Sequence, residues 1–435
     1  MRYIKKSLIV FIFLLISVFG IKLYISTRNF RGMLTSILKA SGLNVEFKNV
    51  RLIGFNTLQI EDLKVKDMAG NVVIYGKKTT AGVNLLMPTR LNRIDVYNGI
   101  VNLERRKNND FNIFHVIKKD PKKPQTYDPT SRIGKLYIHN ATVNYTDISF
   151  SKKISKTLTK VNGKLETARS RGFSIVAKGI GNKNEDGTVE ALKIELKQIL
   201  KSKQSIYSMF DKIKNSDARR KDFRLNFSFE NVGIKEELGQ YVPLEMIKAK
   251  GGILNGVLKL ENNKAKKTMQ ALGSLKIRNG KVSYVDLDGD IEGANAVIDL
   301  KKDKITVNAS TKLKESPVTF ALAYLIQDQK INLKLAADNL PFEEAARYKI
   351  IKNAKIDAQG KVTANLEVNS DIKKKKTTVD GKFSSSNIKL ANYNFQNIKT
   401  AMKIADEKLT LTNTSFVFDE TISGFKIKED VKSDK

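Results

Sequence analysis

The feature that most limits what this chain can fold into is an alternation of apolar and polar residues, which dominates from about residue 43 onward. Such a period of two is typical of β-strands that turn one face toward apolar surroundings. The clearest runs are Phe223, Leu225, Phe227, Phe229; Leu322, Tyr324, Ile326; and Ile331, Leu333, Leu335. The alternation predicts a mainly β chain built from antiparallel meanders.

One outline occurs three times within this pattern. LGSLKIRNGKVSYVD at 272–286 resembles IGKLYIHNATVNYTD at 133–147, and RIDVYNGIVNLE at 93–104 has the same plan. In each, Asn followed by Gly or Ala separates two apolar pairs, as in a hairpin with a two-residue turn. The predicted partners are Ile277 with Val282, Leu275 with Tyr284, Ile138 with Val143, Leu136 with Tyr145, Val96 with Val101, and Ile94 with Leu103.

Two more hairpins are predicted nearer the C-terminus. Lys302-Asp303 would pair Leu300 with Ile305 and Ile298 with Val307, and Asp406-Glu407 would pair Ile404 with Leu409 and Met402 with Leu411. A longer repeat aligns 252–275 with 360–383, which indicates an array of β units, each completed by its neighbour. We therefore expect a β region at 43–240, β repeats at 241–340 and 341–420, and a polar tail at 421–435.

Few helices are expected. Residues 28–41 have apolar residues at helical spacing and suit a juxtamembrane helix that ends near Gly42. Residues 198–214 form a second amphipathic pattern, and Pro341 would open a short helix in PFEEAARYKI.

The N-terminus has the form of an export signal. Arg2, Lys5 and Lys6 precede fourteen apolar residues at 8–21, and the apolar stretch reaches Ile25 if Lys22 extends its amine to the interface. A cleaved signal peptide and an uncleaved anchor are both open; small residues at cleavage spacing are poor, which favours the anchor. We expect an anchor at 1–26 and a juxtamembrane segment at 27–42, with the rest of the chain across the membrane.

Charge suggests an anionic partner but does not identify one. Lys and Arg number 78 against 45 Asp and Glu, a net charge of +33. The basic residues are scattered, and the one dense run, Lys373 to Lys376, fits the solvated tip of a hairpin. Nucleic-acid binding needs aromatic and basic side chains on one face, whereas here they alternate onto opposite faces. We expect no nucleic-acid partner.

The residues offer little for catalysis. There is no Cys, and the histidines are His115 and His139, each best read as a surface or edge residue. The acidic cluster Asp286, Asp288, Asp290 and Glu292 lacks the Gly and Glu positions of a calcium loop, and it suits an Asp288-Gly289 turn between strands. The sequence therefore predicts no enzyme, no cofactor and no metal site.

If the predicted strands lie side by side, their apolar side chains form one continuous face, and each side chain left in water forgoes about 1.5–3 kcal/mol. The face must close on itself, pack against a second sheet, or hold something apolar. The residues expected to line it are Ile94, Val96, Val101, Leu103, Leu136, Ile138, Val143, Tyr145, Phe223, Leu225, Phe227, Phe229, Leu275, Ile277, Val282, Tyr284, Ile298, Leu300, Ile305 and Val307.

Several of these segments together resemble a known family. The N-terminal anchor, GLNVEFKNVRLIGFNTLQIEDLKVKD, RIDVYNGIVNLERR with DFNIFHVI, and the NGKVSY segment are similar to AsmA-like and TamB-like envelope proteins of Gram-negative bacteria. The resemblance implies an elongated, curled antiparallel sheet, an open half-pipe of repeating hairpins, behind an N-terminal transmembrane helix and a few short amphipathic helices. The C-terminal domain of TamB-like proteins has no recognisable counterpart here.

The resemblance also implies a function. It points to an inner-membrane protein, with its N-terminus cytoplasmic and its bulk in the periplasm, that moves phospholipid by its acyl chains toward the outer membrane. The alternative is a scaffold for assembling outer-membrane β-barrel proteins, with an outer-membrane β-barrel partner and sheet edges that bind unfolded strands. A closed, adhesin-like β-solenoid is a third candidate, which the N-terminal anchor disfavours.

Overall fold

The fold is known from a computed structural model. It describes residues 24–40 apart from 26, 44–53, 56–84, 87–107, 110–116, 133–150, 153–168, 172–199, 223–234, 247–263, 268–345, 347, 358–390, 393–405, 408–422 and 425–432. These residues are mostly in strands. They fall into two units: Met1–Ser228 with Leu260–Met269, and Phe229–Lys259 with Gln270–Lys435.

The first unit contains one helix, one 3₁₀ helix and most of the shorter strands. Its elements are α2 (Arg28–Ala40), β1 (Asn44–Glu46), β2 (Asn49–Ile53), β3 (Thr57–Lys66), β4 (Val72–Asn84), β5 (Met87–Arg106), β6 (Asp110–Phe111), η2 (Asn112–His115), β7 (Ile133–Asp147), β8 (Ile154–Ala168), β9 (Gly172–Lys183) and β10 (Val189–Ile199). Strands β11 (Phe223–Gly233) and β12 (Ile247–Asn263) contribute residues to both units.

The second unit is a run of long strands with one short helix. Its elements are β13 (Thr268–Tyr284, from Gln270), β14 (Asp290–Leu300), β15 (Lys304–Leu313), β16 (Ser316–Leu325), β17 (Lys330–Pro341), α4 (Phe342–Ala345), β18 (Ala358–Asp371), β19 (Lys376–Leu390), β20 (Tyr393–Ala405), β21 (Lys408–Ile422) and β22 (Phe425–Lys432). β22 lies within the segment expected to be a polar tail.

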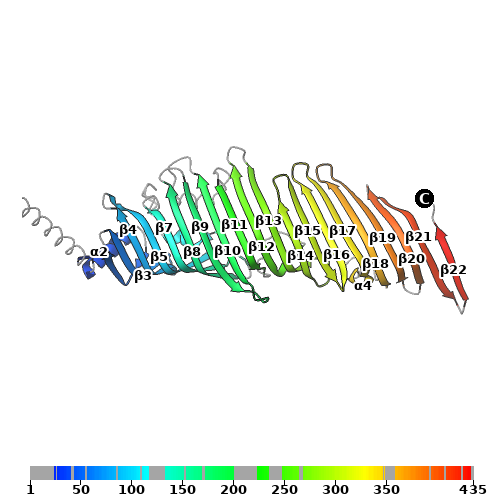
Figure 1. The fold of residues 1–435 in the computed structure, drawn as a ribbon, viewed down its shortest axis with the longest axis horizontal. Helices are drawn as coiled ribbons and strands as arrows, with labels where there is room; N and C mark the ends of the chain where they lie inside the picture. Colours follow the sequence, from blue (N-terminus) through cyan, green and yellow to red (C-terminus); the bar gives the residue numbers. More distant parts are fainter. Residues whose placement is uncertain are drawn as a thin grey trace, which may run out of the picture. The chain divides into compact units, whose positions relative to one another are not determined.

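Each strand of the second unit pairs antiparallel with the next one in the sequence, from β13 through β22. Figure 1 shows them side by side in chain order. Both hairpins predicted here are confirmed with their partners: Ile298 lies opposite Val307, and Ile404 lies opposite Leu409. Sheet formation by consecutive hairpins was therefore predicted correctly in this unit.

The first unit differs from the predicted antiparallel plan at one pair of strands. β1 and β2 both pair with β3, and β3–β4–β5 and β7–β8–β9–β10 are antiparallel, but β5 and β7 run parallel. A parallel pair requires a connection that returns the chain to the starting end, commonly a dozen residues or more. The chain between Arg106 and Ile133, which includes β6 and η2, supplies that connection.

The three predicted Asn-Gly and Asn-Ala hairpins are wrong. Asn98, Asn140 and Asn279 lie inside the single strands β5, β7 and β13, each with a φ near 50°. The pairing register shifts around them, as at a β-bulge: Ile277 faces Ala296 and Gly280 faces Ala294, so Ile277 does not pair with Val282. A bulge inserts one residue without reversing the strand. The inserted residue also shifts the apolar–polar alternation by one position. The apolar residues before and after the bulge therefore share a face, as predicted.

The predicted helices have mixed outcomes. The helix at 28–41 is confirmed as α2. In PFEEAARYKI, Pro341 ends β17 and the described helix is only α4, Phe342–Ala345, although Arg347 follows in a turn. For 198–214, residues 198 and 199 end β10 and the others lie outside the described residues.

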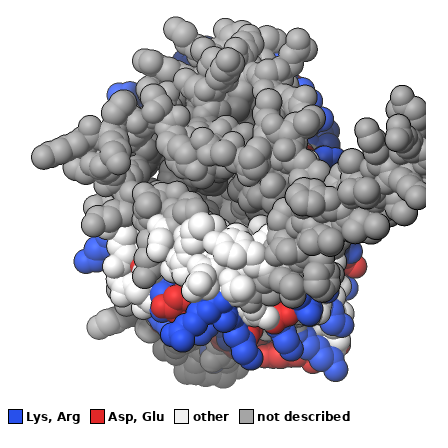
Figure 2. All heavy atoms as spheres, turned by 90° about the vertical axis from the view of Figure 1, so that its left-hand side faces the viewer, with Lys and Arg blue, Asp and Glu red and all other residues white. Residues whose placement is uncertain are grey.

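Charged side chains border a band of other residue types. Figure 2 shows Lys, Arg, Asp and Glu gathered below this band, with further Lys and Arg at the left and upper right. Among the described residues of the first unit, the buried apolar side chains include Val45, Val50, Val73, Val161 and Ile154.

No helix in the described part is long and apolar enough to cross a membrane, and the apolar stretch at 8–21 lies outside that part.

Candidate functional site

Two rows of cross-strand partners define an apolar face in the second unit. The first row passes through eight strands as Ile277, Ala296, Ala309, Phe320, Leu335, Leu366, Gly381 and Met402. The second row, two residues away in each strand, is Leu275, Ile298, Val307, Leu322, Leu333, Val368, Val379 and Ile404. Because side chains two apart in a strand share a face, the two rows are neighbours.

No charged residue interrupts these rows, and the second row is aliphatic throughout. Its side chains are all partly exposed. The buried apolar side chains among the second unit's described residues are Ile253, Leu287 and Ala337, none of which belongs to either row. No second layer from the described residues therefore covers this face.

Six of the predicted lining residues lie together here. Leu275 and Ile298 are partners in the second row, Ile298 also pairs with Val307, and Leu300 pairs with Ile305 at the row beyond. Ile277 belongs to the first row. Val282 faces Ile291 on the far side of the bulge, and Tyr284 follows in the same strand.

The first unit has a matching arrangement across its parallel pair. Ile94 lies opposite Leu136, Val96 opposite Ile138, Val101 opposite Val143, and Leu103 opposite Tyr145. All eight residues were predicted to line the face, but as partners within separate hairpins. The structure instead places the two copies of the repeated outline side by side. Of the run on β11, Leu225, Phe227 and Phe229 are partly exposed, and the side chain of Phe223 lies outside the described residues.

Most residues of the first row were not predicted from the sequence to line the apolar face. Ala296, Ala309 and Gly381 are too small to stand out in an alternation, and Leu366 and Met402 became neighbours only through the register. Leu322, Leu333 and Leu335 showed the alternation but were not assigned to the lining. Their side chains alternate with polar residues along β16 and β17, and this alternation could have assigned them to the lining of the apolar face.

A hollow of about 1090 Å³ follows β13 to β21 in the second unit. Most strands contribute three consecutive residues to its lining, such as Lys276, Ile277 and Arg278. Each of these triplets is centred on a residue of the first row, so the hollow follows that row.

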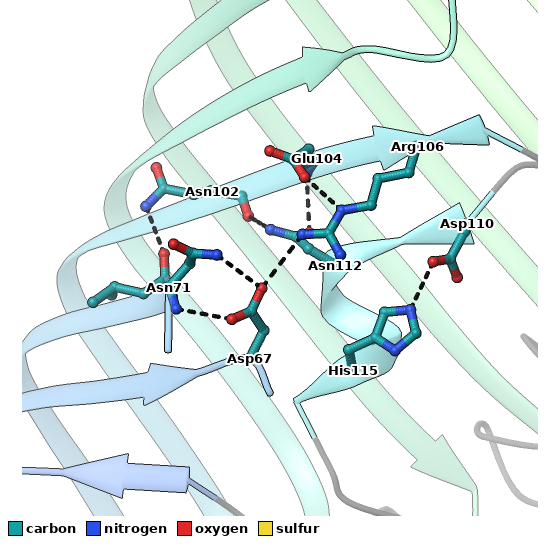
Figure 3. A network of polar contacts seen from close by, with 9 residues as sticks. Asp67, Asn71, Asn102, Glu104, Arg106, Asp110, Asn112 and His115 are labelled. Carbon is teal, nitrogen blue, oxygen red and sulfur yellow. Dashed lines mark hydrogen bonds and ion pairs between the residues drawn. The ribbon is translucent and has the colours of Figure 1, made fainter. Parts of the chain in front are cut away.

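A polar network fixes one end of the strands in the first unit (Figure 3). Backbone N–H of Asn71 donates to Asp67 at 2.8 Å, and Arg106 lies 3.5 Å from the same carboxylate. Asn112 donates its side-chain N–H to the backbone oxygen of Asn102 at 2.8 Å and accepts from the backbone N–H of Glu104 at 3.0 Å. The network ties η2 and the turn after β3 to the edge of β5.

The apolar face of the first unit ends at this same edge in a buried ion pair. Arg105 Nη1 donates to Asp147 Oδ2 at 2.9 Å, and the Asp147 side chain is fully buried. Burial opposes the charge of Arg105, but the hydrogen bond to Asp147, the charge of that carboxylate and the contact with Tyr145 together outweigh burial and raise the arginine pKa. Sequence analysis did not find this pair, because its two residues are 42 positions apart.

The polar face of β5 and β7 has a second cluster, around Asp95. Arg93 donates to both carboxylate oxygens, at 2.6 and 2.7 Å, and His139 Nε2 lies 2.9 Å from Oδ1. The Arg93 guanidinium holds the pKa of Asp95 below its ordinary value, against the effect of burial. The His139 ring stacks on Tyr97 at 4.6 Å. His139 is thus part of a surface cluster, and His115 contacts Asp110 at 2.7 Å in the network above.

No group of three or more His, Asp or Glu side chains suited to a metal ion occurs among the described residues. The turn at Asp288-Gly289 lies between β13 and β14, as predicted, and Asp290 begins β14. There, Arg347 donates to the backbone oxygens of Asp288 and Asp290, each at 2.9 Å. These hydrogen bonds attach the turn between β13 and β14 to Arg347, which follows α4.

The fold and the site define a class: a mainly β protein of consecutive antiparallel strands with an apolar face that its described residues leave uncovered. Comparison of the chain with known protein families, with curated proteins and with solved structures finds no match.

Proposed function

We propose that this chain binds phospholipid acyl chains on its apolar sheet face and carries lipid from the inner toward the outer membrane, as an anchored periplasmic protein. The observation that carries the proposal is the uncovered aliphatic row from Leu275 to Ile404. Burying one Leu, Ile or Val side chain is worth about 1.5–3 kcal/mol, so such a row favours an apolar occupant.

The dimensions and composition of the row suit acyl chains. Eight strands at about 4.8 Å spacing extend about 34 Å. One leaflet of a bilayer contributes about 15 Å of hydrocarbon, half of the core thickness, so two acyl chains would fit end to end along the row. Aliphatic side chains offer no directed polar contact, which suits an occupant without hydrogen-bonding groups.

The N-terminal sequence supports the membrane part of the proposal. Three basic residues precede the apolar stretch at 8–21, which is the charge order of an anchor whose following residues are exported. The resemblance to AsmA-like and TamB-like proteins points the same way.

The test is the amount of phospholipid that copurifies with the full chain, measured by native mass spectrometry and by lipid extraction. Leu322→Asp places a charge in the second row, whereas Ala321→Asp places the same charge on the other face of β16, opposite Lys334. We expect Leu322→Asp to lose most of the bound phospholipid and Ala321→Asp to keep it. Equal lipid in both variants, with circular dichroism showing both folded, would rule out the proposal.

One observation favours the scaffold alternative. β22 pairs with β21, and the other edge of β22 has no strand partner among the described residues. An unpaired edge can accept a strand from an unfolded polypeptide. A photocrosslinker on β22 that captures an outer-membrane protein, in a variant without bound phospholipid, would favour that function.

A further inference from the structure

Three turns at the same end of the second unit's strands adjoin one another among the described residues. They are Lys301–Lys304, Leu325–Lys330 and Asp371–Lys376, named here the basic rim. Backbone N–H of Ile326 donates to the backbone oxygen of Asp303 at 2.9 Å, and that of Ile372 donates to the backbone oxygen of Gln329 at 3.0 Å. Lys373 Nζ also donates to the backbone oxygen of Gln327 at 2.8 Å. The three turns are thus joined side by side.

The basic rim has an unbalanced charge. It contains eight lysines and three aspartates, so it is positive overall. In the described part of the chain, no ion pair involves Lys301, Lys302, Lys304, Lys330 or lysines 373 to 375. Elsewhere in the same unit lysines are paired: Lys281 with Glu292, and Lys314 with Glu343. The ammonium groups of these seven lysines are therefore not paired with carboxylates of the described residues.

Large apolar side chains are exposed among these lysines. Leu325, Ile326 and Ile372 are 36%, 39% and 46% exposed, although turns usually carry Gly, Asn, Asp or Ser. Exposed aliphatic side chains surrounded by lysines are the combination that enters the headgroup region of an anionic bilayer. The positive charge of the basic rim and its exposed apolar side chains thus both favour an anionic bilayer surface as the partner.

The position of the basic rim fits this partner. Leu300, Ile305, Tyr324 and Ile331 form the next cross-strand row inward, continuous with the aliphatic rows of the apolar face. A hollow of about 580 Å³ at the rim is lined by Lys304, Lys330, Lys374 and Lys376, and also by Asp371. Lysine ammonium groups form charge-assisted hydrogen bonds with phosphate oxygens.

The opposite ends of the same strands differ. There the turns carry Glu315 and Asp286, Lys314 lies 3.3 and 3.6 Å from the carboxylates of Glu343 and Glu344, and Arg347 lies 2.6 Å from Glu344. Among the described turn residues at that end, Glu315 and Asp286 are acidic and Lys314 and Arg347 are paired. Among the described turns of these strands, the excess of positive charge therefore lies at the basic rim.

The geometry points to the basic rim as a docking edge for an anionic phospholipid bilayer, through which lipid enters the apolar face laterally. Lysines of the rim contact headgroup phosphates, and Ile326 and Ile372 insert beside them. This inference rests on the proposed function, because it adds the membrane from which the apolar face would take lipid.

The chain contains no Cys, so one engineered cysteine can be labelled alone. Ile372→Cys would carry an environment-sensitive fluorophore on the full chain, reconstituted into vesicles of phosphatidylcholine with or without phosphatidylglycerol. Glu315→Cys, at the opposite strand ends, is the matched control. We expect a blue shift at position 372 only with phosphatidylglycerol, its reversal by high salt, and no shift at 315.

Neutralising lysines should abolish the docking. In the Ile372→Cys background, Lys373→Gln, Lys374→Gln and Lys375→Gln together should lower the ratio of docked to undocked label roughly a hundredfold. An unshifted label at 372 on anionic vesicles, an equal shift on neutral vesicles, or an equal shift at 315 would overturn the inference.

Phospholipid extracted from the same variants separates the two proposals. If the triple Gln variant keeps its bound phospholipid and loses the shift, the docking edge is supported independently of lipid storage. If the wild-type chain shows the shift but holds no phospholipid, docking stands and the proposed function fails. If it holds phospholipid without any shift, only the docking edge fails.

Discussion

Asp147 is a charged residue in a place that water does not reach. Its carboxylate accepts hydrogen bonds from Arg105 Nη1 at 2.9 Å, from the Tyr145 hydroxyl at 3.0 Å and from the backbone N–H of Ser149 at 2.9 Å. A buried charge is tolerated only with such partners. The pair closes the apolar rows of β5 and β7 with a polar boundary, so individual residues set where the apolar face stops.

Asp147→Ala should lower the free energy of unfolding by about 3 kcal/mol, because it leaves Arg105 without its buried partner. Urea unfolding followed by circular dichroism measures the change. Glu292→Ala is the control, since that carboxylate pairs with Lys281 at an exposed site, and its urea midpoint should stay near that of the wild type. Similar midpoints for both variants would contradict this account of Asp147.

Asp95 predicts a dependence on pH. Its pKa in the folded state lies below the ordinary value of about 3.9. The unfolded chain therefore takes up this proton first as the pH falls, and the stabilisation by Asp95 is complete above about pH 4 and disappears as the pH falls through the folded-state pKa. The difference in urea midpoint between the wild type and Asp95→Asn should shrink below about pH 4. A difference that grows with acid would show that the sign is wrong.

At the scale of elements, the local sequence at a bulge inside a strand resembled the sequence of a hairpin turn. Alternation predicted the strands, and it predicted the true hairpins at Lys302-Asp303 and Asp406-Glu407 with their partners. It did not distinguish a turn from a bulge at Asn98, Asn140 and Asn279. Both change the parity of the pattern, and both favour Asn with a positive φ. Whether the strand reverses depends on distant partners.

Ala141 could have distinguished a β-bulge from a hairpin turn. A two-residue type I′ turn needs positive φ at both central residues, whereas in these bulges it falls on Asn140 and the Ala is unconstrained. The buried ion pair and the first row could not be derived in this way. They depend on the parallel pairing of β5 with β7 and on the register across eight strands.

Deleting Asn279 should be far more harmful than replacing it. Without the inserted residue, the strand beyond it moves by one position, and Val282 and Tyr284 turn toward the polar face. Asn279→Gly keeps the insertion and accepts a φ of 50° without strain. We expect the deletion to lower the thermal midpoint by several degrees or to prevent folding, and Asn279→Gly to change it little. Equal midpoints would show that the bulge does not set the face.

At the scale of the whole molecule, stability comes from neighbours in sequence. From β14 to β21 each strand pairs with the strands directly before and after it, and the apolar rows pass through β13 to β20 without a covering layer among the described residues. In such an arrangement the free energy is nearly a sum over neighbouring pairs. The length of the sheet can therefore change without rebuilding a common core.

Removing residues 376–407, which include β19 and β20, should leave a folded chain. The deletion brings Lys408 into the place of Lys376, opposite Asp371, and Thr410 into that of Thr378, opposite Asn369. Strand direction and face are both kept. We expect circular dichroism to show the same strand signal per residue, and native mass spectrometry to show less bound phospholipid per chain. An unfolded product would mean that distant contacts stabilise the unit.

Pairing between consecutive strands also has a consequence for the order of folding. A strand of the second unit needs only its predecessor to form its hydrogen bonds, so the sheet can grow as the chain is synthesised or exported, without waiting for later residues. The parallel pair in the first unit is different. β5 must leave one edge open until the 26 residues after Arg106 have emerged and β7 arrives. That interval is when an incomplete chain most exposes an unpaired edge to chaperones and proteases.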